Sequence, residues 1–338
     1  MKKIGVFLLI IGCFFVGCNC NNSQTKIDNK AAEIPVKLTV VRFDKEIFSS
    51  NDFTILAKKY PSFFKLYTER ILQGGDKSHL EEPQKLLTDF TQNKSIKGLY
   101  DTVEKIFNDF SIYENELNKA FQYHQYYFPK SALPKVYTFI SEFGYGCITA
   151  DSMLGIGLDM FLGEHYPYYF SLQFPEFIIK RCVPKNIIPS AMKAYGQSLI
   201  AEDNNKHRLI DKMVESGKLM YYVDKVLPHY ADSIKMGYSG IQMLWCDFNE
   251  FKIWEFFIKH NLLYSSDMFE VAHYIGDAPV TPGMPPGAPG NIGAWVGWQI
   301  VKKYMNEFPK TTLEQLMKET DGQKILEASH YKPVKKTQ

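Results

Sequence analysis

Hydrophobic and polar positions follow two periods along the chain, and helical spacing dominates. From residue 53 onward, apolar residues mostly recur every three or four positions, the spacing that buries one face of a helix. This spacing predicts helices over 53–72, 86–90, 96–110, 117–127, from about 176 to 226, 238–260, 267–275 and 292–305. Alternation and β-branched or aromatic residues instead predict strands over 36–43, 135–143 and 155–162. The pattern indicates an α+β fold that is mainly α, with a small antiparallel sheet.

The N-terminus has the pattern of an export signal followed by a lipid attachment site. Lys2 and Lys3 precede an apolar run over 4–16, which is shorter than the roughly 20 residues that span a bilayer. A charged start, a short apolar run and small residues are typical of a secretory signal, here residues 1–17. The segment FFVGC resembles a lipobox, so we expect cleavage after residue 17 and a lipid on Cys18. Attachment at Cys13 and an ordinary signal peptide are the alternatives.

The rest of the chain divides into a short tether and one globular domain. Residues 18–34 are polar and lack periodicity, which predicts a flexible, lipidated tether. Residues 35–338 contain no polar linker that would separate two domains, although a Pro- and Gly-rich loop occupies 278–291. We therefore expect one domain in the cell envelope, held by its lipid to the inner or the outer membrane and facing the periplasm.

Charge and cysteine content narrow the possible partners. The net charge is +2, and the 39 basic residues form no block, so nucleic acid is not an expected partner. Cys20, Cys147, Cys182 and Cys246 form no CxxC pair, which argues against zinc fingers and thioredoxin chemistry. Two of the last three could pair in an oxidising compartment, or all could remain free thiols.

No familiar catalytic or metal-binding motif occurs in the sequence. The eight histidines never lie three or four residues apart, so no helix can present a histidine pair to a metal ion. The chain also lacks GxSxG, GxxxxGK[ST] and GxGxxG. We therefore expect no bound metal and no cofactor.

Two groups of polar residues remain as candidate sites. Asp159, Glu164 and His165 lie near the end of a predicted strand, although a strand edge with an aromatic turn explains them as well. Asp211 and Glu215 lie four residues apart in LIDKMVESGKLMYY, as two metal ligands or an acid/base pair would, but a solvated helix face is the simpler interpretation. The Trp295 and Trp298 pair is expected to pack in the core.

Several long blocks of the sequence resemble one bacterial family. These blocks are the lipobox, VVRFDKEIF, YPSFFKLYTERIL, FPKSALPKVYTFISEFGYG, GIGLDMFLGEHYPYY, LIDKMVESGKLMYYVDKVLPHY, NEFKIWEFFIKHNLLYSSD and PGNIGAWVGWQIVKKYM. In order and over nearly the whole chain, they are similar to the GldB family of gliding-motility lipoproteins of the Bacteroidetes. The resemblance implies a role in surface gliding and type IX secretion, and it implies no enzyme activity.

A more distant likeness concerns putative zinc-dependent peptidases, in which an HExxH helix and a later Glu-Gly helix hold the metal. MVESGKLMYY resembles the later helix, and Glu215 would match the third ligand. The first helix should lie in 186–200, but this stretch has neither His nor Glu. The likeness implies a degenerate zincin scaffold with a vestigial site at Asp211 and Glu215. Gly217 would then mark a close approach of a neighbouring helix.

Together these observations predict a protein that acts by binding. The first hypothesis is a non-catalytic component of the gliding and secretion machinery, with protein partners and a membrane contact through its lipid. The second is a cryptic envelope hydrolase, peptidase-like, that uses Asp211 and Glu215. A third, a cell-wall binding module, depends only on the 15% content of aromatic residues.

Overall fold

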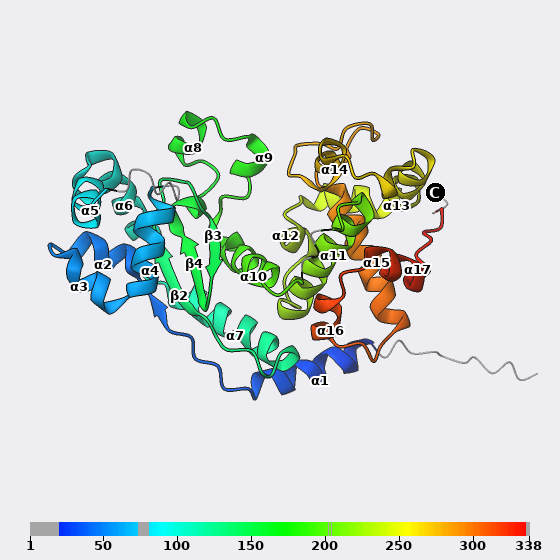
Figure 1. The fold of residues 1–338 in the computed structure, drawn as a ribbon, viewed down its shortest axis with the longest axis horizontal. Coiled ribbons are helices and arrows are strands. Elements are labelled where there is room, and N and C mark those ends of the chain that lie inside the picture. Colours follow the sequence, from blue (N-terminus) through cyan, green and yellow to red (C-terminus); the bar gives the residue numbers. More distant parts are fainter. Residues whose placement is uncertain (1–19, 74–80, 202, 204, 336–338) are drawn as a thin grey trace, which may run out of the picture.

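The structure is a computed structural model that describes residues 20–73, 81–201, 203 and 205–335, with the side chains of 20–23 excluded. The predicted signal peptide and Cys18 lie outside the described residues. Figure 1 shows a small sheet flanked on one side by the helices of residues 43–107, with the helices from residue 209 onward gathered on the other side. Helix α10 (Ile187–Gln197) lies between the two groups and contacts both the sheet and α11 (Leu209–Val226).

The first half of the chain is a series of short helices before the sheet. They are α1 (Cys20–Ala32), α2 (Phe43–Ser49), α3 (Phe53–Lys59), α4 (Pro61–Leu66), the π-helical turn η1 (Tyr67–Ile71), α5 (Pro83–Gln92), α6 (Lys94–Phe107) and α7 (Ser111–Tyr127). The single helix expected over 53–72 is therefore divided. The break lies at Tyr60–Pro61, because proline lacks the backbone N–H that would continue the helix and instead occupies the first turn of the next one.

The sheet is mixed, and the prediction of an antiparallel sheet was wrong. Its strands are β1 (Val40–Val41), β2 (Lys135–Phe139), β3 (Cys147–Ala150) and β4 (Met153–Gly157), in the order β1-β2-β4-β3. The β1–β2 and β2–β4 pairs are parallel, and only the β3–β4 hairpin is antiparallel. Strand β4 is buried along its whole length, as a strand covered on both faces should be. The strand expected over 155–162 ends at Gly157 and continues as the 3₁₀ turn η2 (Leu158–Phe161).

Aromatic side chains form the core between the sheet and the N-terminal helices. The ring of Phe63 stacks on that of Tyr137, with centroids 4.1 Å apart, and Phe43 meets Phe63 edge-on at 5.0 Å. The hydroxyl of the fully buried Tyr67 donates to the carbonyl of Ile140 at 2.8 Å. This hydrogen bond satisfies the one polar atom that burial of the ring would otherwise leave without a partner.

The second half of the chain is almost entirely helical. After β4 it contains α8 (Pro167–Ser171), α9 (Glu176–Ile179), η3 (Pro184–Asn186), α10, α11, α12 (Asp232–Met236), α13 (Gly240–Lys259), η4 (Leu262–Tyr264), α14 (Met268–Ile275), α15 (Ile292–Glu307), α16 (Leu313–Lys318) and α17 (Gly322–Ser329). Trp295 and Trp298 are each 1% exposed on α15, which confirms that they pack in the core. The helices predicted over 238–260, 267–275 and 292–305 correspond to α13, α14 and α15.

Helices α11 and α15 cross at two glycines, and this crossing explains the interruption in the apolar pattern of α11. A Cβ atom on Gly217 would lie 2.2 Å from the carbonyl carbon of Gly297, and one on Gly297 would lie 1.7 Å from the carbonyl oxygen of Met213. Only residues without side chains allow the two backbones to approach so closely. The predicted close approach at Gly217 is thus confirmed, and α15 is the neighbouring helix.

The segment expected to be a flexible tether is instead largely a helix that packs against the domain. Helix α1 contacts α7, and Ala31 at its end is 1% exposed. Tyr123 on α7 donates its hydroxyl to Asp28 at 2.6 Å, and His229 lies 3.5 Å from the same carboxylate. Composition suggested a tether because α1 is polar, but its contacts are specific side-chain interactions that hydrophobic periodicity does not reveal.

Candidate functional site

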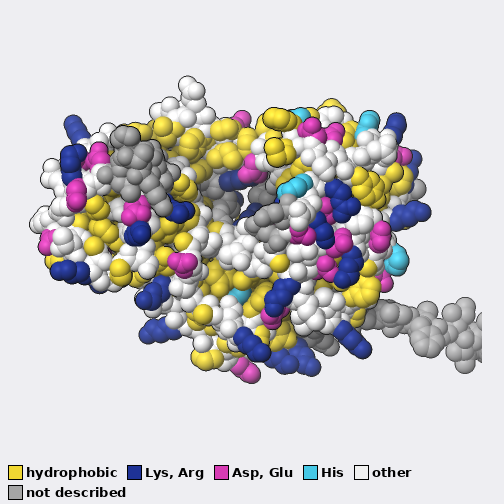
Figure 2. All heavy atoms as spheres, in the orientation of Figure 1, with side chains coloured by type: hydrophobic (Ala, Val, Ile, Leu, Met, Phe, Trp, Pro, Cys, Tyr) yellow, Lys and Arg dark blue, Asp and Glu magenta, His cyan; other side chains and the backbone are white. Residues whose placement is uncertain are grey.

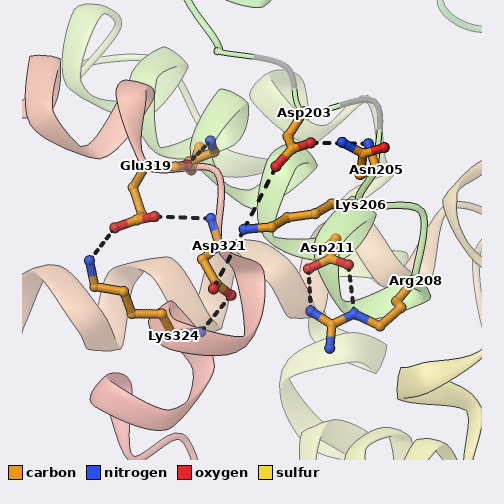
Figure 3. Close-up of polar contacts among 9 residues, drawn as sticks. Asp203, Asn205, Lys206, Arg208, Asp211, Glu319, Asp321 and Lys324 are labelled. Carbon is orange, nitrogen blue, oxygen red and sulfur yellow. Dashed lines mark hydrogen bonds and ion pairs between the residues drawn. The ribbon is translucent and has the colours of Figure 1, made fainter.

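Both acids of the predicted pair lie on α11, and Figure 3 shows Asp211 within a network of ion pairs. Asp211 is buried and receives two hydrogen bonds from Arg208, from Nε at 2.8 Å and from Nη2 at 2.9 Å. Glu215 accepts from Lys212 Nζ at 2.8 Å and from Gln197 Nε2 at 3.5 Å. The contact with Gln197 shows that α10 does lie beside Glu215. Each acid is therefore already matched by its own cation.

The same network joins α11 to the C-terminal helices. Lys218 is 3% exposed and donates to the backbone carbonyl of Glu319 at 2.7 Å, and its burial lowers its pKa to about 8. Lys206 reaches Asp321 at 3.5 Å. Asp211 and Glu215 both border a cavity of only about 20 Å³, enough for about one water molecule. This cluster has the contacts of a structural junction and has no room for a substrate.

The second acidic candidate does not form a site either. Asp159 is fully buried and accepts hydrogen bonds from the backbone N–H groups of Ser141 at 3.0 Å and Phe143 at 2.6 Å. Burial raises its pKa to about 6, although these hydrogen bonds oppose the shift. It holds the turn in which Glu142 and Phe143 have positive φ angles. His165 points into solvent with its side chain 92% exposed, 3.8 Å from Glu164, so the three residues do not converge.

The larger hollows of the described molecule lie between its two groups of helices. One cavity of about 430 Å³ is bordered by the start of β3 and by α10, α11 and α15, and a neighbouring one of about 880 Å³ lies between α9 and the segment around α12 and α13. Figure 2 shows the surface hollowed in this region. Arg181 borders both cavities and forms an ion pair with Asp277 at 2.9 Å, so this pair bridges the two groups of helices.

Lys193 is the cavity residue with the most unusual environment. It lies on α10 and borders the 430 Å³ cavity, and among the described residues its amine has no ion pair or hydrogen bond. Loss of surrounding water lowers its pKa to about 8, with a further contribution from the positive charge of Arg181, while Asp277 partly opposes the shift. An unpaired amine beside an apolar wall is a typical feature of a binding site.

The face of α11 that meets this cavity is not the one that carries the predicted acid. Ser216 borders the 430 Å³ cavity, whereas Glu215 borders the small cavity beside Glu319. On α10, the cavity-facing residues four positions apart are Ser190 and Ala194. No group of three or more His, Cys, Asp or Glu side chains within the described ranges could hold a metal ion.

The three cysteines whose side chains the structure describes are free thiols. Cys147, Cys182 and Cys246 form no disulfide, and burial raises the pKa of the Cys182 thiol to about 11 and that of Cys246 well above its ordinary value. Cys147 and Cys182 border the same cavity as Lys193 and are neutral there, since burial raises the pKa of Cys147 strongly as well. They contribute apolar surface to the wall.

Comparison with known proteins identifies the family. The sequence profile of the family described as gliding motility protein GldB matches residues 24–333. No protein with a curated description and no solved structure matches the chain, so the distant likeness to zinc-dependent peptidases gains no support from these comparisons. In the part of the chain that the structure describes, no helix has both the length and the apolar character needed to cross a bilayer. Because the profile extends over almost the entire chain, the protein belongs to the family of the gliding motility protein GldB.

Proposed function

We propose that this protein is a non-catalytic, lipid-anchored component of the envelope machinery for gliding and type IX secretion, and that it acts by binding other proteins. Family membership implies a role in gliding motility, and the family is named as one of lipoproteins. The proposal adds the anchor at Cys18, the absence of catalysis, the link to secretion and a position facing the periplasm.

The ion pairing of the predicted acids is the observation that favours a non-catalytic role. A general base or a metal ligand must offer a free lone pair to its substrate or ion, at hydrogen-bonding distance or closer. Asp211 instead accepts two hydrogen bonds from Arg208, and Glu215 holds Lys212. A hydrolase that used these two acids would have to break both ion pairs and open a cavity of about 20 Å³.

The cavity-facing positions on α10 and α11 support the same proposal. In zinc peptidases, two ligands lie four residues apart on one helix and a third comes from a second helix. Ser190 and Ala194 are the cavity-facing pair on α10, and Ser216 faces the cavity from α11. None of these side chains is a good zinc ligand at neutral pH.

Complementation of a gene deletion, combined with metal analysis, tests the proposal. The deletion should impair colony spreading, and the Glu215→Gln variant should restore it, because the substitution keeps the shape of the side chain and removes only its charge. The purified full-length protein should contain far less than one equivalent of zinc. Stoichiometric zinc that is lost in Glu215→Gln, together with peptidase activity, would instead establish the hydrolase. Normal gliding, export and detergent resistance in the deletion strain would contradict the envelope role.

A further inference from the structure

We propose that the 430 Å³ cavity between β3, α10, α11 and α15 binds a small ligand that carries one carboxylate on an apolar body, and that Lys193 holds the carboxylate. The proposal concerns a ligand site and does not depend on the partner-binding role above, so either can fail without the other.

The wall of the cavity is suited to an apolar body. Most of the bordering side chains are apolar, among them Met160, Phe161, Ile178, Leu219, Met220 and Met236. Methionine side chains are flexible and polarisable, so three of them allow the wall to adapt to an apolar chain. The volume lies in the range of about 300–1,000 Å³ that is usual for small-molecule sites.

The charge of the cavity indicates a single negative charge on the ligand. Arg181 is already neutralised by Asp277 at 2.9 Å, whereas Lys193 has no such partner among the described residues. Among the described residues, the titratable groups that border the cavity are these three and two cysteines, and the cysteines remain neutral near pH 7 because burial raises their pKa values. One cation therefore remains without an anion.

Two features at the start of α15 add to the recognition of an anion. Asn291 precedes the first residue of the helix and borders the cavity, and its Oδ1 atom is buried and has no hydrogen-bond partner within the described chain. The N–H₂ group of the same side chain, in contrast, is accessible and can donate to a carboxylate in the cavity. The N-terminus of this 16-residue helix also favours negative charge.

Isothermal titration calorimetry with decanoate tests the proposal on the full-length protein. Decanoate should bind, whereas acetate, which lacks the apolar chain, and decan-1-ol, which lacks the charge, should bind at least tenfold more weakly. Lys193→Met keeps most of the side-chain volume and should weaken decanoate binding at least tenfold, because it removes the charged hydrogen-bond donor that holds the carboxylate. Lys193→Arg should retain binding, and the exposed Lys97→Met is the matched control that should change nothing.

The pH dependence gives a second measurement that requires no variant. Because the pKa of Lys193 is about 8 in the free protein, the affinity should be constant near pH 7 and fall by up to tenfold per pH unit above pH 8. The wild-type protein should also take up a proton on binding near pH 8, seen as a dependence of the binding enthalpy on the buffer. Absence of decanoate binding at millimolar concentration, equal binding by Lys193→Met, or equal binding of decan-1-ol would overturn the proposal.

Discussion

The crossing of α11 and α15 makes the effect of a single methyl group on stability predictable. In Gly217→Ala, the new Cβ atom would lie 2.2 Å from both the carbonyl carbon and the carbonyl oxygen of Gly297, and 2.8 Å from the backbone nitrogen of Trp298. All three atoms belong to the backbone of α15, so no side chain can move aside. Ordinary contact begins at 3.4 Å, and the two helices must therefore separate by about 1 Å.

The expected cost follows from two opposing contributions. Alanine in a helix interior is favoured over glycine by about 1 kcal/mol, which would stabilise the variant. Overpacking of a close-packed interface costs about 1–3 kcal/mol, and separation of the helices also loosens the contacts of the buried Trp295 and Trp298. We expect overpacking to exceed the helical preference, with a net loss of about 1–2 kcal/mol in the free energy of unfolding.

Urea denaturation followed by circular dichroism measures this difference. The matched control is Gly98→Ala on α6, where a Cβ atom would meet nothing within 4 Å. This control should stabilise the protein by about 0.5–1 kcal/mol, because only the helical preference acts there. If Gly217→Ala is as stable as the wild type or as stable as the control variant, the close approach of the two backbones is not the reason for the glycine.

Three further predictions concern other parts of the molecule. The pKa of Asp159 is raised to about 6 in the folded protein, so its stabilising contribution is complete below about pH 4 and is lost as the pH rises through 6. Asp159→Asn should therefore become more stable relative to the wild type between pH 4 and pH 6 in thermal melts, and a difference that does not change with pH would contradict this. Cys182 and Cys246 should label with a thiol reagent only after unfolding, because both are buried and have raised pKa values; rapid labelling in the native protein would argue against their burial. Cys18→Ala should abolish fatty-acid labelling and partition into detergent, whereas Cys13→Ala should change neither; persistent labelling of the first variant would place the lipid elsewhere.

Local periodicity predicted the helices well because their buried faces are regular. The spacing of the apolar positions was sufficient to predict α11 and α15 as helical, and the glycine within α11 indicated that a neighbouring helix approaches closely. The sequence did not predict which helix this neighbour is. Gly217 and Gly297 are 80 positions apart, and neither segment contains a pattern that indicates contact with the other. The prediction of the strand directions in the sheet was wrong for a similar reason. Strand β1 has only two residues, and its parallel pairing with β2 joins segments almost 100 positions apart.

The candidate cavity was even less accessible to sequence reasoning. Lys193, Arg181 and Asn291 come from three separate segments, and no spacing rule connects them. The acids that did have a recognisable spacing, Asp211 and Glu215, proved to be held by Arg208 and Lys212. A spacing of four residues places two side chains on the same side of a helix, but it does not reveal whether each of them already forms an ion pair with a neighbouring cation.

The packing of α1 on α7 has a consequence for how a lipid on Cys18 would orient the protein. A disordered segment of about 17 residues would let the domain drift and turn at up to roughly 55–60 Å from the lipid. Only two residue steps separate Cys18 from the first residue of α1, and they reach about 7 Å. A lipid on Cys18 would thus bring the beginning of α1 to the headgroups and restrict the rotation of the whole molecule. Partners would then meet it from a limited range of directions, with the opposite side presented outward.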